Sequence, residues 1–266
     1  MVSMLRPRVI PCLLVRDKGL VKTVQFGESK YVGDPLNAVR IFNEKEVDEL
    51  IVLDIDATAH GREPDYKMIE NLAAECHMPL CYGGGVTSAE QVQRIISLGV
   101  EKVAISAAVL ARPEFISEVA EQVGSQSVVV VLDVRKRGLF GKYCLQTHNG
   151  TKNSNLDPVK FAQEVEKLGA GEIVINSIDM DGVMSGYDAN LVNKIREQTK
   201  LPLTILGGAG SLEDISDLYD RFGIIGAAAG SLFVFKGVYK AVLINYPNRQ
   251  EKHQLFDKAR QSGTIQ

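Results

Sequence analysis

The sequence has little net charge, no long apolar segment and no signal-peptide pattern. Its 266 residues carry 30 Lys and Arg against 33 Asp and Glu, a formal charge of −3 at pH 7. A balance of this kind does not favour nucleic acid or an anionic membrane as a partner. Without an apolar span or a targeting segment, the chain is expected to be cytoplasmic and not associated with a membrane.

Cysteines are few, and their spacing is irregular. They stand at Cys12, Cys76, Cys81 and Cys144, two of them within apolar runs, so we expect them to be reduced and mostly buried. Cys76-His77 with Cys81 has some of the ligands of a metal site, but no second ligand cluster accompanies them. A dinucleotide fingerprint is also missing. The sequence therefore predicts neither a metal nor another cofactor.

The chain does contain a regular alternation of short apolar runs and amphipathic stretches. Eight runs predict strands: Val9–Val15, Leu50–Ile55, Pro79–Tyr82, Val103–Ser106, Val128–Val134, Ile173–Ser177, Leu201–Leu206 and Ile224–Ala228. Helical patterns lie near 36–47, 65–75, 88–98, 113–122, 157–168, 189–198, 211–220 and 236–244. This alternation favours an α/β fold of the (β/α)8 TIM barrel type. A doubly wound open sheet is the alternative.

The two halves of the sequence resemble each other. Leu53-Asp-Ile-Asp56 matches Ile178-Asp-Met-Asp181, and Gly83-Gly-Gly85 matches Gly207-Gly-Ala-Gly210. We therefore expect a single barrel domain over 1–266, built of half-barrels at about 1–123 and 124–266 and favoured over the open sheet.

Glycine-rich turns follow three predicted strands. Glycine lets backbone N–H groups approach a phosphate, and the helix that follows adds partial positive charge. Two related turns on opposite sides of a barrel favour a ligand with two phosphates. The alternative is that these turns merely need glycine. The candidate residues are Gly84 and Gly85, Gly207 and Gly208, and Gly230-Ser231.

The stretch Ser177–Asp188 places two acids, Asp179 and Asp181, where a predicted buried strand ends. Acids at the carboxyl end of a parallel strand favour a functional site. The alternative interpretation is structural, with Asp181-Gly182 as a turn and Asp188 as a helix cap.

Two polar excursions interrupt the β/α pattern. The segment Arg16–Pro35 has the length and composition of a mobile lid, and its Lys22 is a candidate phosphate ligand. The segment Arg135–Asn155 predicts a hairpin around Gly141 and Asn149-Gly150.

Four charged residues stand at or just before the start of predicted strands: Arg8, Glu49, Lys102 and Glu172. If they point inward, they meet at the N-terminal mouth of the barrel, where unpaired charges would be costly. A closed ring of ion pairs and a gate to the barrel interior are both compatible with this pattern.

Together these segments resemble the cyclase subunit of imidazole glycerol phosphate synthase, from histidine biosynthesis, over nearly the whole chain. The segments that carry the resemblance are Arg8–Cys12, Gly33–Pro35, Asp48–Leu50, Leu53-Asp54, Tyr82–Gly85, Gly124–Gln126, Ser177–Asp188, Leu206–Gly210 and Ala229–Ser231. The resemblance implies a (β/α)8 barrel made of two similar halves. It also implies a glutaminase subunit on the N-terminal face and ammonia that crosses the barrel to a bis-phosphate substrate.

In that family two aspartates, at the ends of strands one and five, act as general acid and base. Asp133 matches one of them, but the partner position is Leu14, and leucine cannot transfer a proton. Asp17, three residues further on, is not an obvious substitute. Ser106-Ala107 and Met180 also depart from the family pattern, which removes phosphate donors at Ser106-Ala107.

Other family positions are kept. These are Lys22, Asp181-Gly182, Gly208 and Gly230-Ser231 at one phosphate site, Cys12, and all four charges of the ammonia gate. This combination favours a divergent paralogue that supplies ammonia for a lipopolysaccharide-type sugar, together with a sugar amidotransferase. The alternatives are the standard lyase-type cyclase, a non-catalytic scaffold that activates a glutaminase, and a barrel isomerase of the same pathway.

Overall fold

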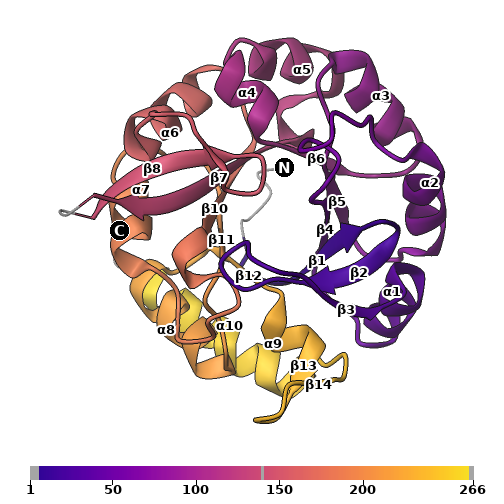
Figure 1. Cartoon of the computed structure of the whole chain (residues 1–266). Helices are drawn as coiled ribbons and strands as arrows, with labels where there is room; N and C mark the ends of the chain where they lie inside the picture. Colours follow the sequence, from indigo (N-terminus) through magenta and orange to yellow (C-terminus); the bar gives the residue numbers. More distant parts are fainter. Residues whose placement is uncertain (1–5, 139–140, 264–266) are drawn as a thin grey trace.

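The chain folds into a closed barrel of parallel strands inside a ring of helices (Figure 1). The structure is a computed structural model that describes residues 6–138 and 141–263. The barrel strands are β1 (Arg8–Arg16), β4 (Leu50–Asp54), β5 (Leu80–Gly83), β6 (Lys102–Ile105), β7 (Val128–Arg137), β10 (Glu172–Ser177), β11 (Leu203–Leu206) and β12 (Gly226–Ala229). Because β12 pairs with β1, the sheet closes. The predicted (β/α)8 barrel is confirmed and the open sheet is wrong.

Helices follow the strands as the amphipathic stretches predict. They are α1 (Pro35–Glu44), α2 (Tyr66–Glu75), α3 (Ala89–Ser97), α5 (Phe115–Val123), α6 (Pro158–Lys167), α7 (Ala189–Arg196) and α8 (Leu212–Phe222), with short α4 (Ala107–Ala111) and α9 (Ser231–Val234). Ser88 and Ser211 begin α3 and α8 with capping boxes, in which side chain and backbone satisfy each other's hydrogen bonds. None of the described helices is long and apolar enough to cross a membrane.

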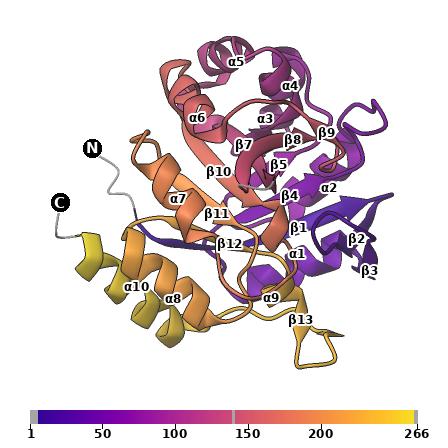
Figure 2. The same ribbon diagram turned by 60° about the vertical axis from the view of Figure 1, so that its left-hand side comes forward.

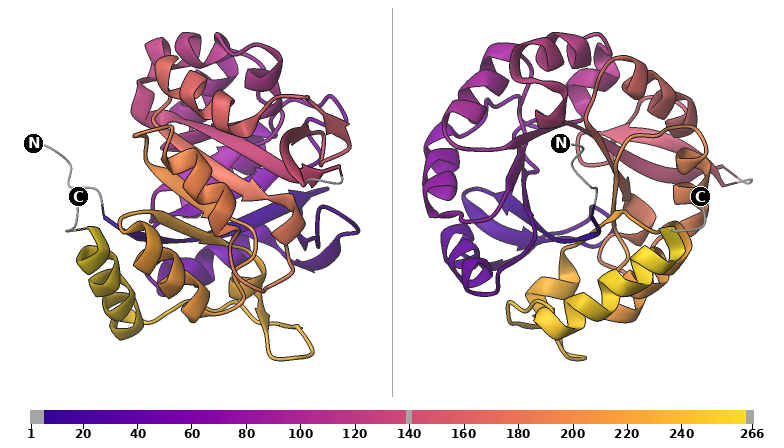
Figure 3. Two further views of the ribbon diagram at one scale, coloured as in Figure 1. Left: turned by 90° about the vertical axis from the view of Figure 1, so that its left-hand side faces the viewer. Right: turned by 180° about the vertical axis from the view of Figure 1, so that it is seen from behind.

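The helix predicted over 236–244 is wrong. Residues there form a hairpin of β13 (Phe235–Lys236) and β14 (Ala241–Val242), which projects from the barrel in Figure 2. Gly237 and Lys240 have positive φ, which breaks a helix, and no core lies beneath the apolar pattern. The last helix is α10 (Arg249–Gly263), which packs beside α8 (Figure 3) and was not predicted.

Both polar excursions contain strands. The first forms β2 (Gly19–Lys22) and β3 (Lys30–Gly33), an antiparallel pair joined to β1, and its predicted mobility stays a prediction. The second forms β8 (Lys142–Thr147) and β9 (Lys152–Asn153) and confirms a hairpin there, although residues 139–140 of its turn lie outside the described residues. Both excursions extend from the carboxyl ends of barrel strands.

Buried apolar side chains form two clusters. The larger lies between the strands and the helices, and the smaller fills the barrel interior. The interior cluster includes Ile10, Cys12, Leu14, Ile51, Cys81, Ala104, Val129, Val131, Val174, Leu206 and Ala228. They recur every second residue along their strands, as inward-facing positions must. The four cysteines are unpaired, with Cys12 and Cys81 buried and the other two half-buried.

Candidate functional site

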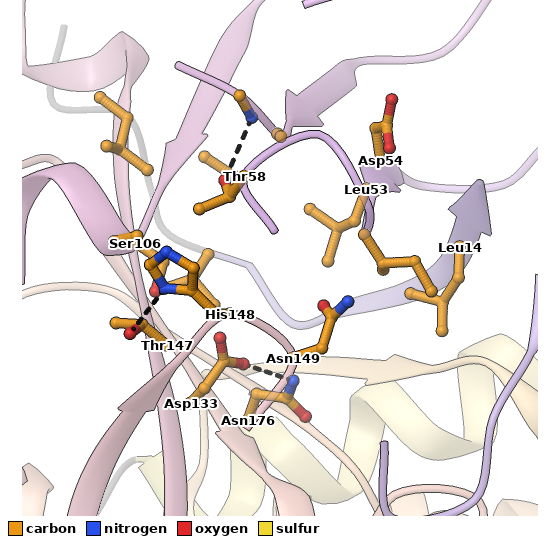
Figure 4. Close-up of a pocket in the computed structure, with 18 of the residues that line it drawn as sticks. Leu14, Leu53, Asp54, Thr58, Ser106, Asp133, Thr147, His148, Asn149 and Asn176 are labelled. Atoms are coloured by element: carbon orange, nitrogen blue, oxygen red, sulfur yellow. Dashed lines mark hydrogen bonds between the residues drawn. The ribbon is translucent and has the colours of Figure 1, made fainter. Parts of the chain in front are cut away.

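A pocket opens where the carboxyl ends of six barrel strands meet. Its lining includes the predicted site residues Gly84, Gly85, Ser106 and Asp133 and the departed position Leu14 (Figure 4). Parallel strands bring their carboxyl ends to one face, so residues from distant parts of the sequence share this cavity.

Asp133 lies on β7 at the pocket floor, next to Asn176 of β10. The Asn176 side-chain amide donates a hydrogen bond of 2.8 Å to Oδ1 of Asp133. Burial raises the pKa of Asp133 to about 6, against the opposing effect of this hydrogen bond, and the charge of Asp181 adds to the rise. Ser106 also opposes the rise, although its hydroxyl lies outside hydrogen-bond geometry. Asp133 can therefore exchange a proton near neutral pH.

Replacing Asp133 by asparagine is expected to stabilise the fold at pH 8. Burial favours the protonated form of Asp133, so its contribution to the free energy of unfolding is fully present below the unfolded-state pKa. That contribution is lost as pH rises through the folded-state pKa. Because the pKa rises from 3.8 to about 6, the ionised carboxylate lowers the free energy of unfolding by about 2–3 kcal/mol at pH 8. Urea unfolding of Asp133→Asn should show most of this gain at pH 8 and little below pH 4. The control is Asp217→Asn at an exposed position, which should change the free energy of unfolding little at either pH. Equal gains in both variants would contradict this explanation.

Leu14 lies on β1 and lines the pocket. The residue is 7% exposed. Figure 4 shows Leu14 and Leu53 across the cavity from Asp133. Asp54 also lines the pocket, but its Oδ1 already accepts the backbone N–H groups of Asp56 and Ala57. Asp54 is the only other carboxylate among the described residues that line the pocket, and burial raises its pKa.

The loop residue Asp17 does not fill this role either. Its side chain is 78% exposed and lies 3.7 Å from Arg62.

The pocket lining also includes His148, Asn149 and Asn176, which were not predicted as site residues. His148 and Asn149 belong to the β8–β9 loop, where their φ angles are 51° and 54°. Both residues line the pocket. Burial lowers the pKa of His148, and Lys152 adds to this effect. Asn176 could have been found from spacing, because it follows inward-facing Glu172 by four residues on one strand.

A second, small cavity gathers Lys22 with the glycine turns after β11 and β12. It is lined by Lys22, Asp181, Gly182, Gly207, Gly208, Gly230 and Ser231. Lys22 is 6% exposed, and its Nζ lies 2.2 Å from where a Cβ on Gly230 would stand. Among residues 6–138 and 141–263, no carboxylate lies within ion-pair distance of this ammonium. A buried cation beside glycine turns is suited to an anion.

The glycines alone do not decide between phosphate binding and tight turns. A Cβ on Gly84 would lie 2.4 Å from the Asp54 carbonyl oxygen, and one on Gly208 would lie 2.0 Å from that of Gly186. Close backbone approach therefore requires glycine at both positions, with or without a ligand. The cavity at Lys22 has a buried ammonium beside its glycine turns, which favours phosphate binding there. Among the described residues, no lysine lines the pocket at the Gly84-Gly85 turn.

The two acids of the Ser177–Asp188 stretch hold neighbouring loops. Asp181 accepts a hydrogen bond of 2.7 Å from the Thr23 hydroxyl, and Asp179 accepts one of 2.8 Å from the backbone N–H of Lys136. Asp188 caps α7 as the structural alternative predicted, accepting the N–H of Leu191.

At the opposite mouth, the four predicted charges form a closed ring. Arg8 contacts Glu49 at 2.5 Å and Glu172 at 2.7 Å, and Lys102 contacts the same two carboxylates at 2.8 and 2.9 Å. Thr204 donates a further hydrogen bond to Glu172. Burial acts to raise the pKa of Glu172, but Arg8 and Lys102 hold it well below its usual range. The ring therefore pairs all four charges at this end of the barrel.

The described part of the chain contains no cluster of three or more His, Cys, Asp or Glu side chains suited to a metal ion.

Comparisons with known proteins agree with this arrangement. A family model described as "Histidine biosynthesis protein" matches residues 8–240. A Vibrio vulnificus protein named "Putative imidazole glycerol phosphate synthase subunit hisF3" is 59% identical over 254 residues, 96% of this chain and 98% of the relative. A Leptospira borgpetersenii protein named "Putative imidazole glycerol phosphate synthase subunit HisF" is 57% identical, over 95% of this chain and all of the relative.

A further relative, from Lactiplantibacillus plantarum, is named "Imidazole glycerol phosphate synthase subunit HisF". It is 39% identical over 232 residues, which cover 87% of this chain and 92% of the relative. The chain therefore belongs to the histidine biosynthesis family and, within it, to the HisF-type cyclase subunits of imidazole glycerol phosphate synthase.

Proposed function

We propose that the chain is the ammonia-receiving barrel of a glutamine amidotransferase. A glutaminase partner docks on its N-terminal face, and a phosphorylated small molecule binds on the opposite face. Within this role we favour a divergent paralogue that supplies ammonia to a sugar amidotransferase modifying a lipopolysaccharide-type sugar. The observation that carries this choice is Leu14, which faces the pocket where the family's second proton-transferring aspartate would stand.

A single acid limits what the pocket can catalyse. Cleavage and ring closure need groups on both sides of the reacting carbons that exchange protons with them, and Asp133 supplies only one. Loss of one member of such a pair costs about two to four orders of magnitude in rate. Supplying ammonia to another enzyme needs no such pair.

The ion-pair ring and the apolar interior support a route for ammonia. In this proposal ammonia enters at the N-terminal mouth past the ring of Arg8, Glu49, Lys102 and Glu172, which acts as a gate. Beyond the ring lie apolar layers that a neutral molecule such as ammonia crosses at lower cost than an ion.

The Lys22 cavity supports binding of a phosphorylated ligand. Its ammonium is buried, and no described carboxylate lies within ion-pair distance of it, so an anion would compensate its desolvation.

Lys22→Met, which keeps length but removes charge, is expected to weaken binding of inorganic phosphate about 10–100-fold, the value of one charge-assisted hydrogen bond. Isothermal titration measures this directly. Lys18→Met is the matched control, since Lys18 lies in the same excursion with a side chain 82% exposed. Equal affinity in natural protein and Lys22→Met would remove this cavity from the proposal.

Two other functions remain as alternatives. The standard cyclase reaction is favoured by His148, a second titratable group in the pocket. A non-catalytic scaffold would stimulate glutamine hydrolysis by the glutaminase yet bind no phosphate, whereas the favoured role requires both stimulation and phosphate binding.

A further inference from the structure

The main pocket, which is the one that contains Asp133, carries more negative than positive charge. Its described lining holds two carboxylates, Asp54 and Asp133, and a single lysine or arginine, Arg16. The Arg16 guanidinium is already engaged. Its Nε and Nη2 each donate a hydrogen bond of 2.9 Å to the Asp56 carboxylate, and its Nη1 donates one of 2.7 Å to Ser29. No lysine or arginine in this described lining is therefore free to meet an anion.

A phosphate group is poorly suited to the main pocket. It carries a charge of about −1.5 to −2 at pH 7, and like charges at close range oppose each other's ionisation. Burial raises the pKa of Asp133 only to about 6, so its carboxylate is ionised at pH 7.5. The Lys22 cavity differs, because a buried ammonium stands there beside the turn at Gly230-Ser231. The two glycine turns predict two phosphates, but the charges favour one.

Uncharged polar groups of the β8–β9 loop also line the main pocket. His148 and Asn149 are both half-buried and are labelled among the lining residues in Figure 4. His148 Nδ1 lies 3.0 Å from the Thr147 hydroxyl, whereas the described residues offer no hydrogen-bond partner to His148 Nε2 or to the Asn149 side-chain amide. Burial and Lys152 lower the pKa of His148, so its imidazole is neutral at pH 7.5. Neutral imidazole and amide groups pair well with hydroxyl groups, which both donate and accept.

The main pocket and the Lys22 cavity adjoin at Thr23. This residue lines the main pocket and directly follows Lys22 in the sequence. Its hydroxyl donates a hydrogen bond of 2.7 Å to Asp181, which lines the Lys22 cavity. One ligand can therefore reach both cavities, with a phosphate at Lys22 and its remaining part in the main pocket.

We propose that this face of the barrel binds a ligand with one phosphate and an uncharged, hydroxyl-rich head, such as a sugar monophosphate, in preference to a bis-phosphate. The phosphate binds beside Lys22, and the hydroxyl groups meet His148 and Asn149 in the main pocket. The carboxylates of Asp54 and Asp133 select against a second phosphate. This inference rests on the proposed function in one respect, that a phosphorylated small molecule binds on this face.

Isothermal titration of the purified chain at pH 7.5 with inorganic phosphate, fructose 6-phosphate and fructose 1,6-bisphosphate tests the inference. The two sugars differ by one phosphate. Fructose 6-phosphate is expected to bind about tenfold tighter than inorganic phosphate, the value of one or two hydrogen bonds, and the bisphosphate no tighter than the monophosphate. A bisphosphate that binds tighter than the monophosphate by about tenfold, or a monophosphate that gains nothing over inorganic phosphate, overturns the inference.

Two variants separate the contributions. Asn149→Gly permits the positive φ at this position but removes the amide, so it should weaken fructose 6-phosphate about fivefold and leave inorganic phosphate unchanged. Asp133→Asn removes a negative charge and should strengthen the bisphosphate more than the monophosphate. Equal effects on both ligands of either pair would contradict the assignment. If inorganic phosphate itself does not bind, the Lys22 site of the proposed function fails as well; if it binds but the sugar adds nothing, only this inference fails.

Discussion

Replacing Glu172 by glutamine is expected to lower the free energy of unfolding by about 3–5 kcal/mol, the usual cost of removing one partner from a buried ion pair. Glu172 contacts both Arg8 and Lys102, at 2.7 and 2.9 Å, and only 7% of its side chain is exposed. Glutamine keeps the shape but leaves two partly buried cations sharing the single carboxylate of Glu49. Urea denaturation at neutral pH measures the loss.

The pH dependence gives this prediction a direction. Arg8 and Lys102 depress the pKa of Glu172, so its stabilising contribution is present above the unfolded-state pKa and is lost as pH falls through the folded value. The natural protein should therefore approach the stability of Glu172→Gln in acid, and the two should differ most at neutral pH.

The matched control is Glu70→Gln, which removes an exposed pair with Lys67. Its side chains are 54% and 76% exposed, and such pairs contribute about 0–1 kcal/mol. A loss in Glu172→Gln no larger than in Glu70→Gln would mean that the ring is not a stabilising feature.

The barrel itself could be predicted because the apolar pattern of each strand agrees with the burial that the strand has in the fold. The run Val128–Val131 is buried throughout, as a strand covered on both faces requires, and its apolar pattern is visible in the sequence. The helix predicted over 236–244 failed because an apolar pattern indicates a helix only if a core lies beneath it. There Val238 and Tyr239 are 95% and 96% exposed, on a turn.

The site was less predictable because long-range contacts place part of it. His148 lies against the pocket because the β8–β9 loop is held there. One such contact is Arg135, which donates hydrogen bonds to the carbonyls of Gly150 and, 110 residues away, Gln25. Strand spacing could have placed Asn176 inward, but not its hydrogen bond to Asp133.

The central claim is that Leu14 has removed the cyclase reaction from this pocket while the route for ammonia remains. The most direct measurement supplies the purified chain with the histidine-pathway bis-phosphate substrate and excess ammonium salt at mildly alkaline pH, and follows substrate consumption by absorbance. Leu14→Asp restores the second acid, and Leu14→Asn is its control, of similar size without a proton to transfer.

The natural chain and Leu14→Asn are expected to turn over about two to four orders of magnitude more slowly than the ordinary enzymatic rate of roughly once per second. Activity in Leu14→Asp alone would show that one residue separates the chain from its relatives, and inactivity of all three would favour a different acceptor. Turnover by the natural chain at roughly once per second or faster would contradict the claim. Loss of that activity in His148→Gln would then identify the compensating group.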